Sequence, residues 1–310
     1  MTTGFYTHSD CMLHEMGDWH PESPQRLQAI EDQLIASQIA PWLARREAPL
    51  ASFDDLARIH GGVAIADIRD NTPIDRNSYH ALDGDTVLNS HSWNAALRAA
   101  GAAVAATDAV LKGELANAFC AIRPPGHHAM PNAAMGFCLF NNIAIAARHA
   151  VEVGGLERVA IVDFDVHHGN GTEAAFANDP HVLMVSFFQH PFYPYSGVPP
   201  LGDNMLNDPL PAYSEGDVVR RLVTEKWLPA LHAHQPQMIF ISAGFDAHRE
   251  DDLGQMGLVE ADYAWITQQI MAVAAQHAHG RIVSCLEGGY NLSALGRSVA
   301  AHVRALAGID

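Results

Sequence analysis

Acidic and histidine residues follow an apolar run near the middle of the chain. The run RVAIV (158–162) leads directly into the segment DFDVHHGNGT (163–172). A carboxylate that is buried without a partner is costly, so acids at the end of an apolar strand need an ion or a hydrogen-bond network. This segment therefore predicts a polar or metal-binding site.

The spacing inside this segment fits a metal site. In a continuing strand, Asp163, Asp165 and His167 would lie at i, i+2 and i+4 and point to one side. Carboxylate and imidazole donors suit Zn²⁺ or Fe²⁺, and three protein ligands leave a position open for water or substrate. The remaining ligand is expected from Asp246, at the end of another apolar run. A water held there would have its pKa lowered toward about 7.

Other apolar runs also end in residues that can transfer protons. Run 118–123 precedes His127 and His128, and run 281–287 precedes Tyr290. Ligands of open parallel sheets bind beyond the carboxyl ends of the strands, so we expect these side chains at one edge. The histidines are candidates for proton transfer, and Tyr290, after two glycines, could donate its hydroxyl to a developing oxyanion.

The elements that must position these residues alternate along the chain. From about residue 94 onward, short apolar runs alternate with helix-period segments, which is typical of a parallel sheet with helices on both faces. The predicted strands are 118–123, 158–164, 182–188, 237–245 and 281–287, and the predicted helices are 95–113, 141–155, 215–234, 260–280 and 293–308.

The remaining segments are less regular. One helix is expected within 20–36, after a proline-rich start. A loop is expected over 71–85, and a long proline-rich loop over 188–211 could cover a site. The sequence contains no linker rich in glycine and serine and no repeat. We therefore expect one α/β domain over residues 1–310.

Composition limits the partners. The chain has 18 basic and 35 acidic residues, a net charge of −17, which disfavours nucleic acid and acidic membranes and tolerates cationic substrates. The four cysteines show no CxxC spacing, and no signal peptide or membrane-spanning run is evident. A cytoplasmic protein without a membrane partner is expected.

Five motifs together resemble those of the zinc-dependent histone deacetylase family, which has the arginase/deacetylase fold. They are RPPGHHA (123–129), GFCLFNN (136–142), DFDVHHGNGT (163–172), SAGFDAH (242–248) and LEGGY (286–290). The segment HPESPQRL near residue 20, and Asn170 in place of the aspartate common in class I, look like class II and its bacterial relatives, which include acetylpolyamine amidohydrolases. The motifs follow the family order over nearly the whole chain and are jointly specific.

This resemblance implies roles for individual residues. One catalytic Zn²⁺ would be held by Asp165, His167 and Asp246. His128 would act as general base and then acid beside the neutral Asn170. His127, held by Asp163, would be its electrostatic partner, and Tyr290 would polarise the amide carbonyl.

The resemblance also implies contacts with substrate and with potassium. The substrate-binding set would be Asp85, Gly136, Phe137, Tyr193, Gly288 and Gly289, and a structural K⁺ would lie at Asp163, Asp165, His167, Ser186 and Phe187. From the residues alone, Phe137 could equally be a core residue, and Asp85 could simply solvate a turn. Family relatives include monomers, dimers and tetramers, so a homo-oligomer is compatible with the resemblance.

Several functions remain open at this point. The leading one is a zinc amidohydrolase that removes acyl groups from acyl-lysine peptides or from small acetylated amines, with an acetylpolyamine-specific enzyme as an alternative. A binuclear manganese ureohydrolase would need a second aspartate two residues after Asp246, where His248 stands. A catalytically silent module that binds acyl-lysine or cations would fit a site without its tyrosine, but Tyr290 is present.

Overall fold

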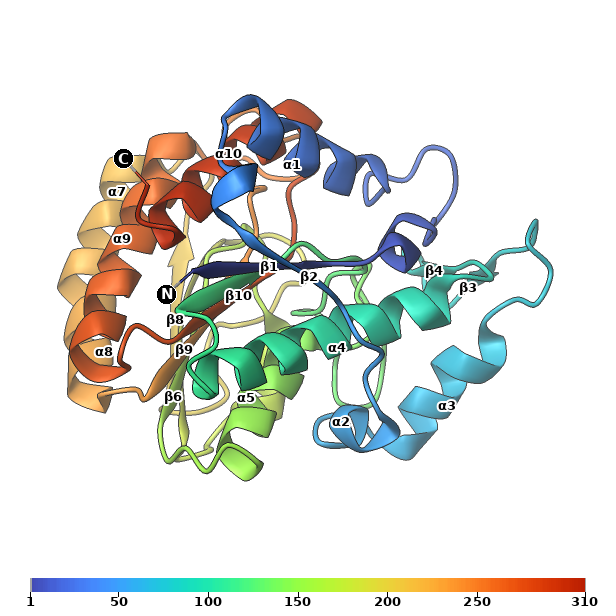
Figure 1. Ribbon diagram of the computed structural model, residues 1–310, viewed down its shortest axis with the longest axis horizontal. Helices are drawn as coiled ribbons and strands as arrows, with labels where there is room; N and C mark the ends of the chain where they lie inside the picture. Colours follow the sequence, from blue (N-terminus) through green and yellow to red (C-terminus); the bar gives the residue numbers. More distant parts are fainter. Residues whose placement is uncertain (1, 310) are drawn as a thin grey trace.

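The computed structural model describes residues 2–309 and has an eight-stranded sheet at its centre (Figure 1). The strand order is β2-β1-β5-β10-β9-β6-β7-β8, and every neighbouring pair in it is parallel. The strands of this sheet are β1 (Thr3–Thr7), β2 (Ala44–Glu47), β5 (Asn117–Cys120), β6 (Val159–Asp163), β7 (Val182–Gln189), β8 (Met205–Leu210), β9 (Met238–Ala243) and β10 (Ile282–Leu286). A separate antiparallel pair is formed by β3 (His80–Ala81) and β4 (Val87–Leu88).

Helices cover both faces of the sheet (Figure 1). One face packs against α1 (Gln25–Ala36), α7 (Gly216–Leu222), α8 (Leu228–His234), α9 (Glu260–His277) and α10 (Leu292–Leu306), and the other against α4 (Ser92–Leu111) and α5 (Asn142–Glu152). Shorter helices are α2 (Phe53–Ala57), α3 (Gly62–Asn71) and α6 (Asn170–Phe176), with 3₁₀ turns at Ser9–Met12 and Ala40–Trp42. A parallel sheet covered on both faces explains why its central strands are continuous apolar runs.

The five predicted strands are confirmed as β5, β6, β7, β9 and β10, to within a few residues at their ends. Every residue of these five strands is buried. The predicted helices are also confirmed, except that segment 215–234 is divided into α7, a π-helical turn at Val223–Trp227, and α8. The predicted α/β architecture with a parallel sheet is therefore correct.

Three strands of the sheet are missing from the sequence-based prediction. Strand β2 has the sequence ARRE and is mostly exposed, and β1 lies in the region that shows no clear periodicity. The prediction of a loop over all of 188–211 is wrong at β8, which lies at the edge of the sheet and contains Pro209. Proline is tolerated on an edge strand because its missing N–H faces no partner, so β8 carries little of the usual strand signal.

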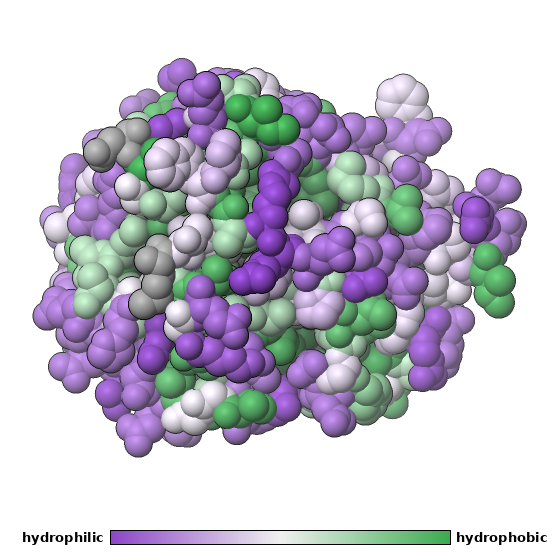
Figure 2. Space-filling view, viewed as in Figure 1, coloured by the Kyte–Doolittle hydropathy of each residue, from purple (hydrophilic) through white to green (hydrophobic). Residues whose placement is uncertain are grey.

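No helix in the part of the chain that the structure describes is long and apolar enough to cross a membrane. On the face seen in Figure 2, hydrophilic and apolar residues are intermixed.

A buried charge network attaches the N-terminal region to the sheet. Glu22, Arg26 and Arg123 are each fully buried. Arg26 Nη1 donates to Glu22 Oε1 at 3.0 Å, and Arg123 Nη2 donates to Glu22 Oε2 at 2.6 Å. Burial alone would raise the pKa of Glu22, but the charge of Arg123 and its hydrogen bonds outweigh this effect and lower the pKa to about 2. Glu22 is therefore ionised and neutralises two buried guanidinium groups.

We expect Glu22→Gln to lower the free energy of unfolding by about 3–5 kcal/mol at neutral pH, because buried guanidinium groups lose their counter-charge. The folded-state pKa of Glu22 (about 2) lies below its ordinary value of 4.5. The wild-type advantage should therefore be complete above about pH 4.5 and decrease as the pH falls toward 2. Urea unfolding of both proteins at several pH values measures this difference.

Glu15→Gln is the matched control, because it removes the same charge from an exposed side chain of the same loop. Its effect should stay within about 0.5 kcal/mol. An equally small effect of Glu22→Gln, or a difference that does not decrease in acid, would contradict the interpretation.

Candidate active site

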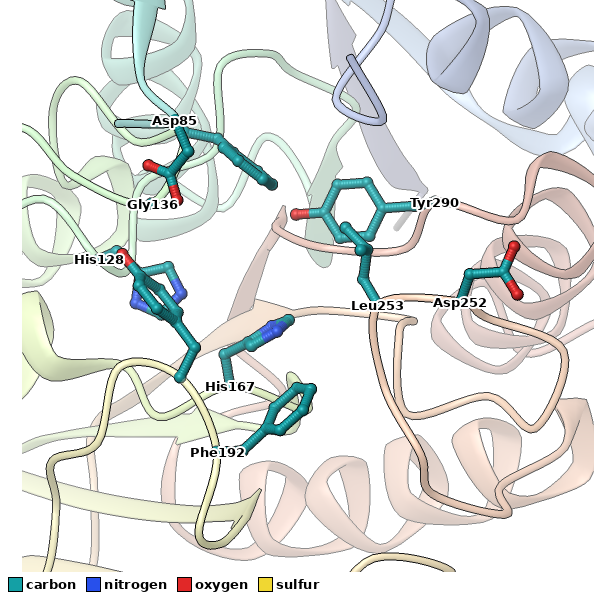
Figure 3. Close-up of a pocket in the computed structure, with 10 residues that line it drawn as sticks. Asp85, His128, Gly136, His167, Phe192, Asp252, Leu253 and Tyr290 are labelled. Atoms are coloured by element: carbon teal, nitrogen blue, oxygen red, sulfur yellow. The ribbon is translucent and has the colours of Figure 1, made fainter. Parts of the chain in front are cut away.

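A cavity of about 230 Å³ opens beyond the carboxyl ends of the strands (Figure 3). Its walls come from loops that are far apart in the sequence. The lining residues are Asp85, His128, Gly136, Phe137, His167, Phe192, Tyr193, Asp252, Leu253 and Tyr290. The sheet edge predicted to carry the site is thus the edge at which the cavity lies.

Three donor side chains converge at the floor of this cavity. One ligand atom each of Asp165, His167 and Asp246 lies within 4.8 Å of the others. His167 Nδ1 is 3.1 Å from Asp165 Oδ1 and 3.2 Å from Asp246 Oδ2. These separations are close to those between neighbouring ligands of a tetrahedral ion with bonds of about 2.0–2.1 Å.

The electrostatics of this cluster favour a cation. Asp246 Oδ2 is buried and has no hydrogen-bond partner among the described residues, although His167 Nδ1 is close. Burial alone would lower the pKa of His167, but Asp165 and Asp246 outweigh it and raise the pKa to about 10. Two buried carboxylates beside one imidazole therefore strongly favour a positive charge at this point. The donor set fits a divalent ion such as Zn²⁺.

Backbone amides orient the carboxylates of the cluster. Gly288 N donates to Asp165 Oδ2 at 2.8 Å, and Val166 N donates to Asp246 Oδ1 at 2.9 Å. These hydrogen bonds fix the direction of both carboxylates. Asp165 Oδ1 also accepts from the amide of His167 at 2.9 Å, whereas Asp246 Oδ2 has no hydrogen-bond partner among the described residues and is available to a ligand. The cluster is therefore held in place before any ion binds.

Asp163 lies beside the donor cluster rather than in it. Strand β6 ends at Asp163, so the extended alternation expected for Asp163, Asp165 and His167 does not continue. Asp163 Oδ1 accepts from the amide of Asp165, and Asp163 Oδ2 lies 3.0 Å from Nδ1 of His127. The expectation of three side chains on one strand face is thus wrong, because the backbone turns as soon as the strand ends.

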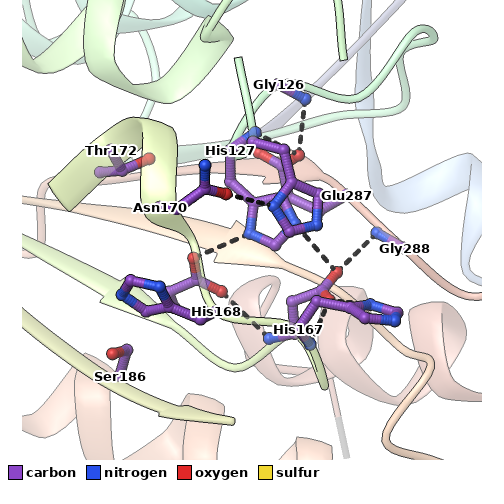
Figure 4. Close-up of polar contacts among 12 residues, drawn as sticks. Gly126, His127, His167, His168, Asn170, Thr172, Ser186, Glu287 and Gly288 are labelled. Atoms are coloured by element: carbon purple, nitrogen blue, oxygen red, sulfur yellow. Dashed lines mark hydrogen bonds and ion pairs between the residues drawn. The ribbon is translucent and has the colours of Figure 1, made fainter. Parts of the chain in front are cut away.

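The two adjacent histidines have different partners (Figure 4). His127 pairs with Asp163, whereas His128 Nδ1 lies 2.7 Å from Asn170 Oδ1. Asn170 Nδ2 contacts the sulfur of Met130, so its oxygen faces His128 and requires a proton on Nδ1. In neutral His128 the other ring nitrogen, Nε2, is then left to accept a proton.

The pKa values of the two histidines are shifted in opposite directions. Burial alone would lower the pKa of His127, but the charges of Asp165 and Asp163 raise it well above the usual value. Burial lowers the pKa of His128, and the neighbouring His127 and His167 lower it further. The pair therefore combines one imidazole that retains its proton with one that is neutral.

Tyr290 enters the cavity from a glycine turn. Its hydroxyl points into the cavity in Figure 3, and its ring contacts Phe137 at 5.8 Å between ring centres. A Cβ on Gly288 would lie 1.9 Å from Asp246 Oδ2, so the turn can approach the donor cluster only without a side chain there. Burial raises the pKa of Tyr290 well above its usual value. The hydroxyl thus keeps its proton and can donate it in a hydrogen bond.

The structure places most of the predicted substrate-binding residues around the cavity. Asp85, Gly136, Phe137 and Tyr193 line it, and Gly288 and Gly289 form the turn before Tyr290. Phe137 has a positive φ of 68°, and its amide donates to Thr86 Oγ1 at 3.1 Å, which ties it to the loop of Asp85.

Other predicted residues lie away from the cavity, and some lining residues were not predicted. Ser186 faces Asp163 across β6 and β7, and the Phe187 ring stacks on Trp227 in the core. Three lining residues were missed: Phe192, which stacks on His167 at 5.5 Å, Asp252 and Leu253. Their only sequence signals are proximity to Tyr193 and to the SAGFDAH motif.

The Histone deacetylase domain model matches residues 20–306. The chain belongs to the histone deacetylase family. This membership confirms the family inferred from the motifs and identifies the chain as a hydrolase of the deacetylase and amidohydrolase type.

Relatives of this deacetylase occur in plants, bacteria and animals. It is 38% identical to "Histone deacetylase 14, chloroplastic" of Arabidopsis thaliana over 94% of this chain and 74% of that protein. It is 36% identical to "Histone deacetylase-like amidohydrolase" of Pseudomonas aeruginosa over 93% of this chain and 82% of that protein. It is 34% identical to "Polyamine deacetylase HDAC10" of Homo sapiens over 99% of this chain and 48% of that protein.

A solved deacetylase structure confirms the fold. The crystal structure of the HDA15 HD domain superposes with a TM-score of 0.92 at 32% sequence identity, and the match covers 99% of this chain and 90% of that one. The arginase/deacetylase fold predicted from the motifs is therefore correct.

We expect Asp246→Asn to weaken Zn²⁺ binding by at least about 100-fold, because it replaces a charged ligand with a neutral one. Loss of a residue that merely hydrogen-bonds to a metal ligand already lowers metal affinity by about 10–100-fold. Competition with a chelating dye, together with the zinc content after dialysis, measures this. Asp252→Asn is the control: it removes a charge from the same loop outside the donor cluster. Equal affinity of the two variants would show that Asp246 is not a ligand.

Proposed function

We propose that this deacetylase is a zinc-dependent enzyme that hydrolyses the amide bond of an acyl-lysine side chain or of another acylated amine. The observation that carries the proposal is the convergence, in one cavity, of a three-donor cluster, a neutral imidazole and a protonated tyrosine hydroxyl. Family membership supports the reaction type. Zn²⁺ itself, its ligands and the residue roles belong to the proposal.

Zn²⁺ bound by Asp165, His167 and Asp246 would supply Lewis-acid polarisation of the amide carbonyl and would lower the pKa of a water molecule. His128 accepts the proton of the attacking water at Nε2 and delivers it to the amine nitrogen as the C–N bond breaks. The products are a carboxylate and a free amine. Neutral Asn170 keeps His128 in the tautomer that this exchange requires.

His127 and Tyr290 act on the charge that develops during the reaction. His127, paired with Asp163, keeps a positive charge beside His128. Tyr290 donates its hydroxyl hydrogen to the carbonyl oxygen as negative charge grows on it. Groups oriented in this way stabilise the transition state more than the substrate.

The aromatic walls would bind the stem of the acylated amine. Phe137, Tyr193 and Gly136 line the passage, and Asp85 would receive polar groups of the substrate. Gly288 and Gly289, in the turn before Tyr290, complete the substrate-binding set that the family resemblance implies. We further propose one catalytic domain over residues 1–310. A structural K⁺ would be held by Asp163, Asp165, His167, Ser186 and Phe187, as the family resemblance implies.

The charge of the cavity favours a cationic substrate. Among residues 2–309, those that line it include Asp85 and Asp252 but no lysine or arginine. Acetylated polyamines keep free ammonium groups and satisfy this condition, whereas an acyl-lysine peptide does so only through other basic residues. The similarity to a polyamine deacetylase supports the polyamine class as the alternative. Against a binuclear manganese site, the described residues form a cluster of only three donors. Against a silent binding module, Tyr290 is in place.

We expect Tyr290→Phe to lower kcat by about 10²–10³-fold with little change in KM, because the lost hydrogen bond forms mainly in the transition state. Hydrolysis of acetyl-lysine peptides, longer acyl-lysine peptides and acetylated polyamines by zinc-loaded protein measures this effect. The control is Tyr213→Phe, which alters an exposed tyrosine outside the cavity and should match the wild type.

Full activity of Tyr290→Phe on a confirmed substrate would reject the role of the tyrosine. No wild-type turnover across the panel, with one zinc bound per chain, would instead favour the binding module.

A further inference from the structure

Asp251 connects the loop that carries Asp246 to the turn that carries Tyr290. Its side chain is nearly buried, with 5% exposure. Asp251 Oδ2 accepts from the amides of Tyr290 at 2.6 Å and Asn291 at 2.9 Å, and Oδ1 accepts from the amide of Leu253 at 3.0 Å. One carboxylate therefore links three amides on two separate segments.

The turn of Tyr290 is bonded to other loops through Gly288, whose carbonyl accepts from Phe245 N at 3.0 Å and whose amide donates to Asp165 Oδ2 at 2.8 Å, whereas the amide of Tyr290 itself is bonded to Asp251. It lies between the end of β10 at Leu286 and the start of α10 at Leu292, and Gly289 adopts a φ of +116°. Glycine is the least restricted residue, so a Gly-Gly turn is not held by its own conformational preferences. The amide of Tyr290 adjoins the Cα that carries the ring, so a bond to this amide limits the direction of the side chain.

Helix capping does not account for these bonds. Asn291 is the N-cap of α10, and its own side chain accepts from the amide of Ala294 at 3.0 Å. The helix therefore has a cap that is independent of Asp251. What Asp251 adds is the connection between the tyrosine turn and the loop after β9, in which Asp246 lies five residues before Asp251.

A second contact supports the opposite side of the turn. Arg26 Nε donates to Gly289 O at 2.7 Å, and its guanidinium carbon lies 4.9 Å from the centre of the Tyr290 ring. Loss of Asp251 would therefore loosen the turn without releasing it. A small displacement of the hydroxyl is the expected consequence.

We propose that Asp251 is a positioning residue that sets the place of the Tyr290 hydroxyl relative to the donor cluster. The proposal rests on the proposed function, in which Tyr290 must reach a carbonyl oxygen that is also in contact with the metal site. Asp251 touches neither substrate nor metal. It acts through the backbone amide of Tyr290, and displacements of about 1 Å in such groups cost on the order of 10²-fold in rate.

The test is a double-mutant cycle with Asp251→Asn and Tyr290→Phe, measuring kcat and KM. Asparagine keeps the size of the side chain but has a single acceptor oxygen, so it cannot accept from Leu253 on one side and from Tyr290 and Asn291 on the other at the same time. We expect Asp251→Asn to lower kcat by about 10–100-fold, with KM changed less than about two-fold. In the Tyr290→Phe background the same substitution should lower kcat by less than about two-fold, because the hydroxyl that Asp251 positions is already absent.

A merely structural role gives a different result. It would lower kcat by the same factor in both backgrounds, and this additivity, or an unchanged kcat of Asp251→Asn, would overturn the proposal. Glu250→Gln is the matched control, since it alters the adjacent exposed carboxylate, which pairs with Arg297, and should leave kcat unchanged. Asp251→Glu retains a carboxylate, so its kcat should lie between those of Asp251→Asn and the wild type. This variant also provides a test if Asp251→Asn does not fold.

If Tyr290→Phe has too little turnover to measure, the same double-mutant cycle can be measured by ligand binding instead of kcat. The Kd of a simple alkyl hydroxamate, a zinc-binding analogue whose carbonyl would accept from Tyr290, is measured for the same four proteins. Non-additive losses support the role of Asp251, and additive losses reject it. No wild-type turnover of any substrate would contradict the proposed function alone, because the hydroxamate cycle still reports on Asp251.

Discussion

Four carboxylates share the buried carboxyl edge of the sheet, and their negative charge must be balanced there. They belong to Asp163, Asp165, Asp246 and Glu287. In a medium of low polarity such a group is tolerated only with hydrogen-bond donors or positive charges around it. Amides from several loops and two imidazoles supply these partners. The requirement to neutralise this edge therefore determines where the loops run, and the reactive geometry follows from it.

Glu287 joins two of these loops. Its Oε2 accepts from the amides of Gly126 at 2.7 Å and His127 at 3.0 Å, and the next amide, Gly288, donates to Asp165 (Figure 4). The turn that carries the tyrosine is thus bonded both to the segment with the histidines and to the segment with the donor cluster. Groups that are oriented before the substrate arrives need little reorganisation during the reaction.

The sequence predicts the interior of this fold better than its margins. Strands such as β6 and β9 are recognisable because their residues, apart from Ser242, are apolar until the acids appear. The same change from apolar to acidic residues identifies Asp165 and Asp246. Strand β8 and the partly exposed β2 lack this contrast. The contacts of Arg26 with the tyrosine turn could not be predicted, because they join charges and carbonyls more than 250 positions apart, and no local pattern encodes such a pairing.

Glycine residues at the floor of the cavity limit which positions of such an enzyme can be substituted. A Cβ on Gly244 would lie 2.0 Å from Asp165 Oδ2, and one on Gly288 would lie 1.9 Å from Asp246 Oδ2, so neither position has room for any side chain. Phe192 and Leu253, by contrast, stand on surface loops around the opening. Changes in acyl length or amine preference must therefore arise at the rim, and anyone redesigning the enzyme for a new amide would vary those loops while leaving the floor untouched.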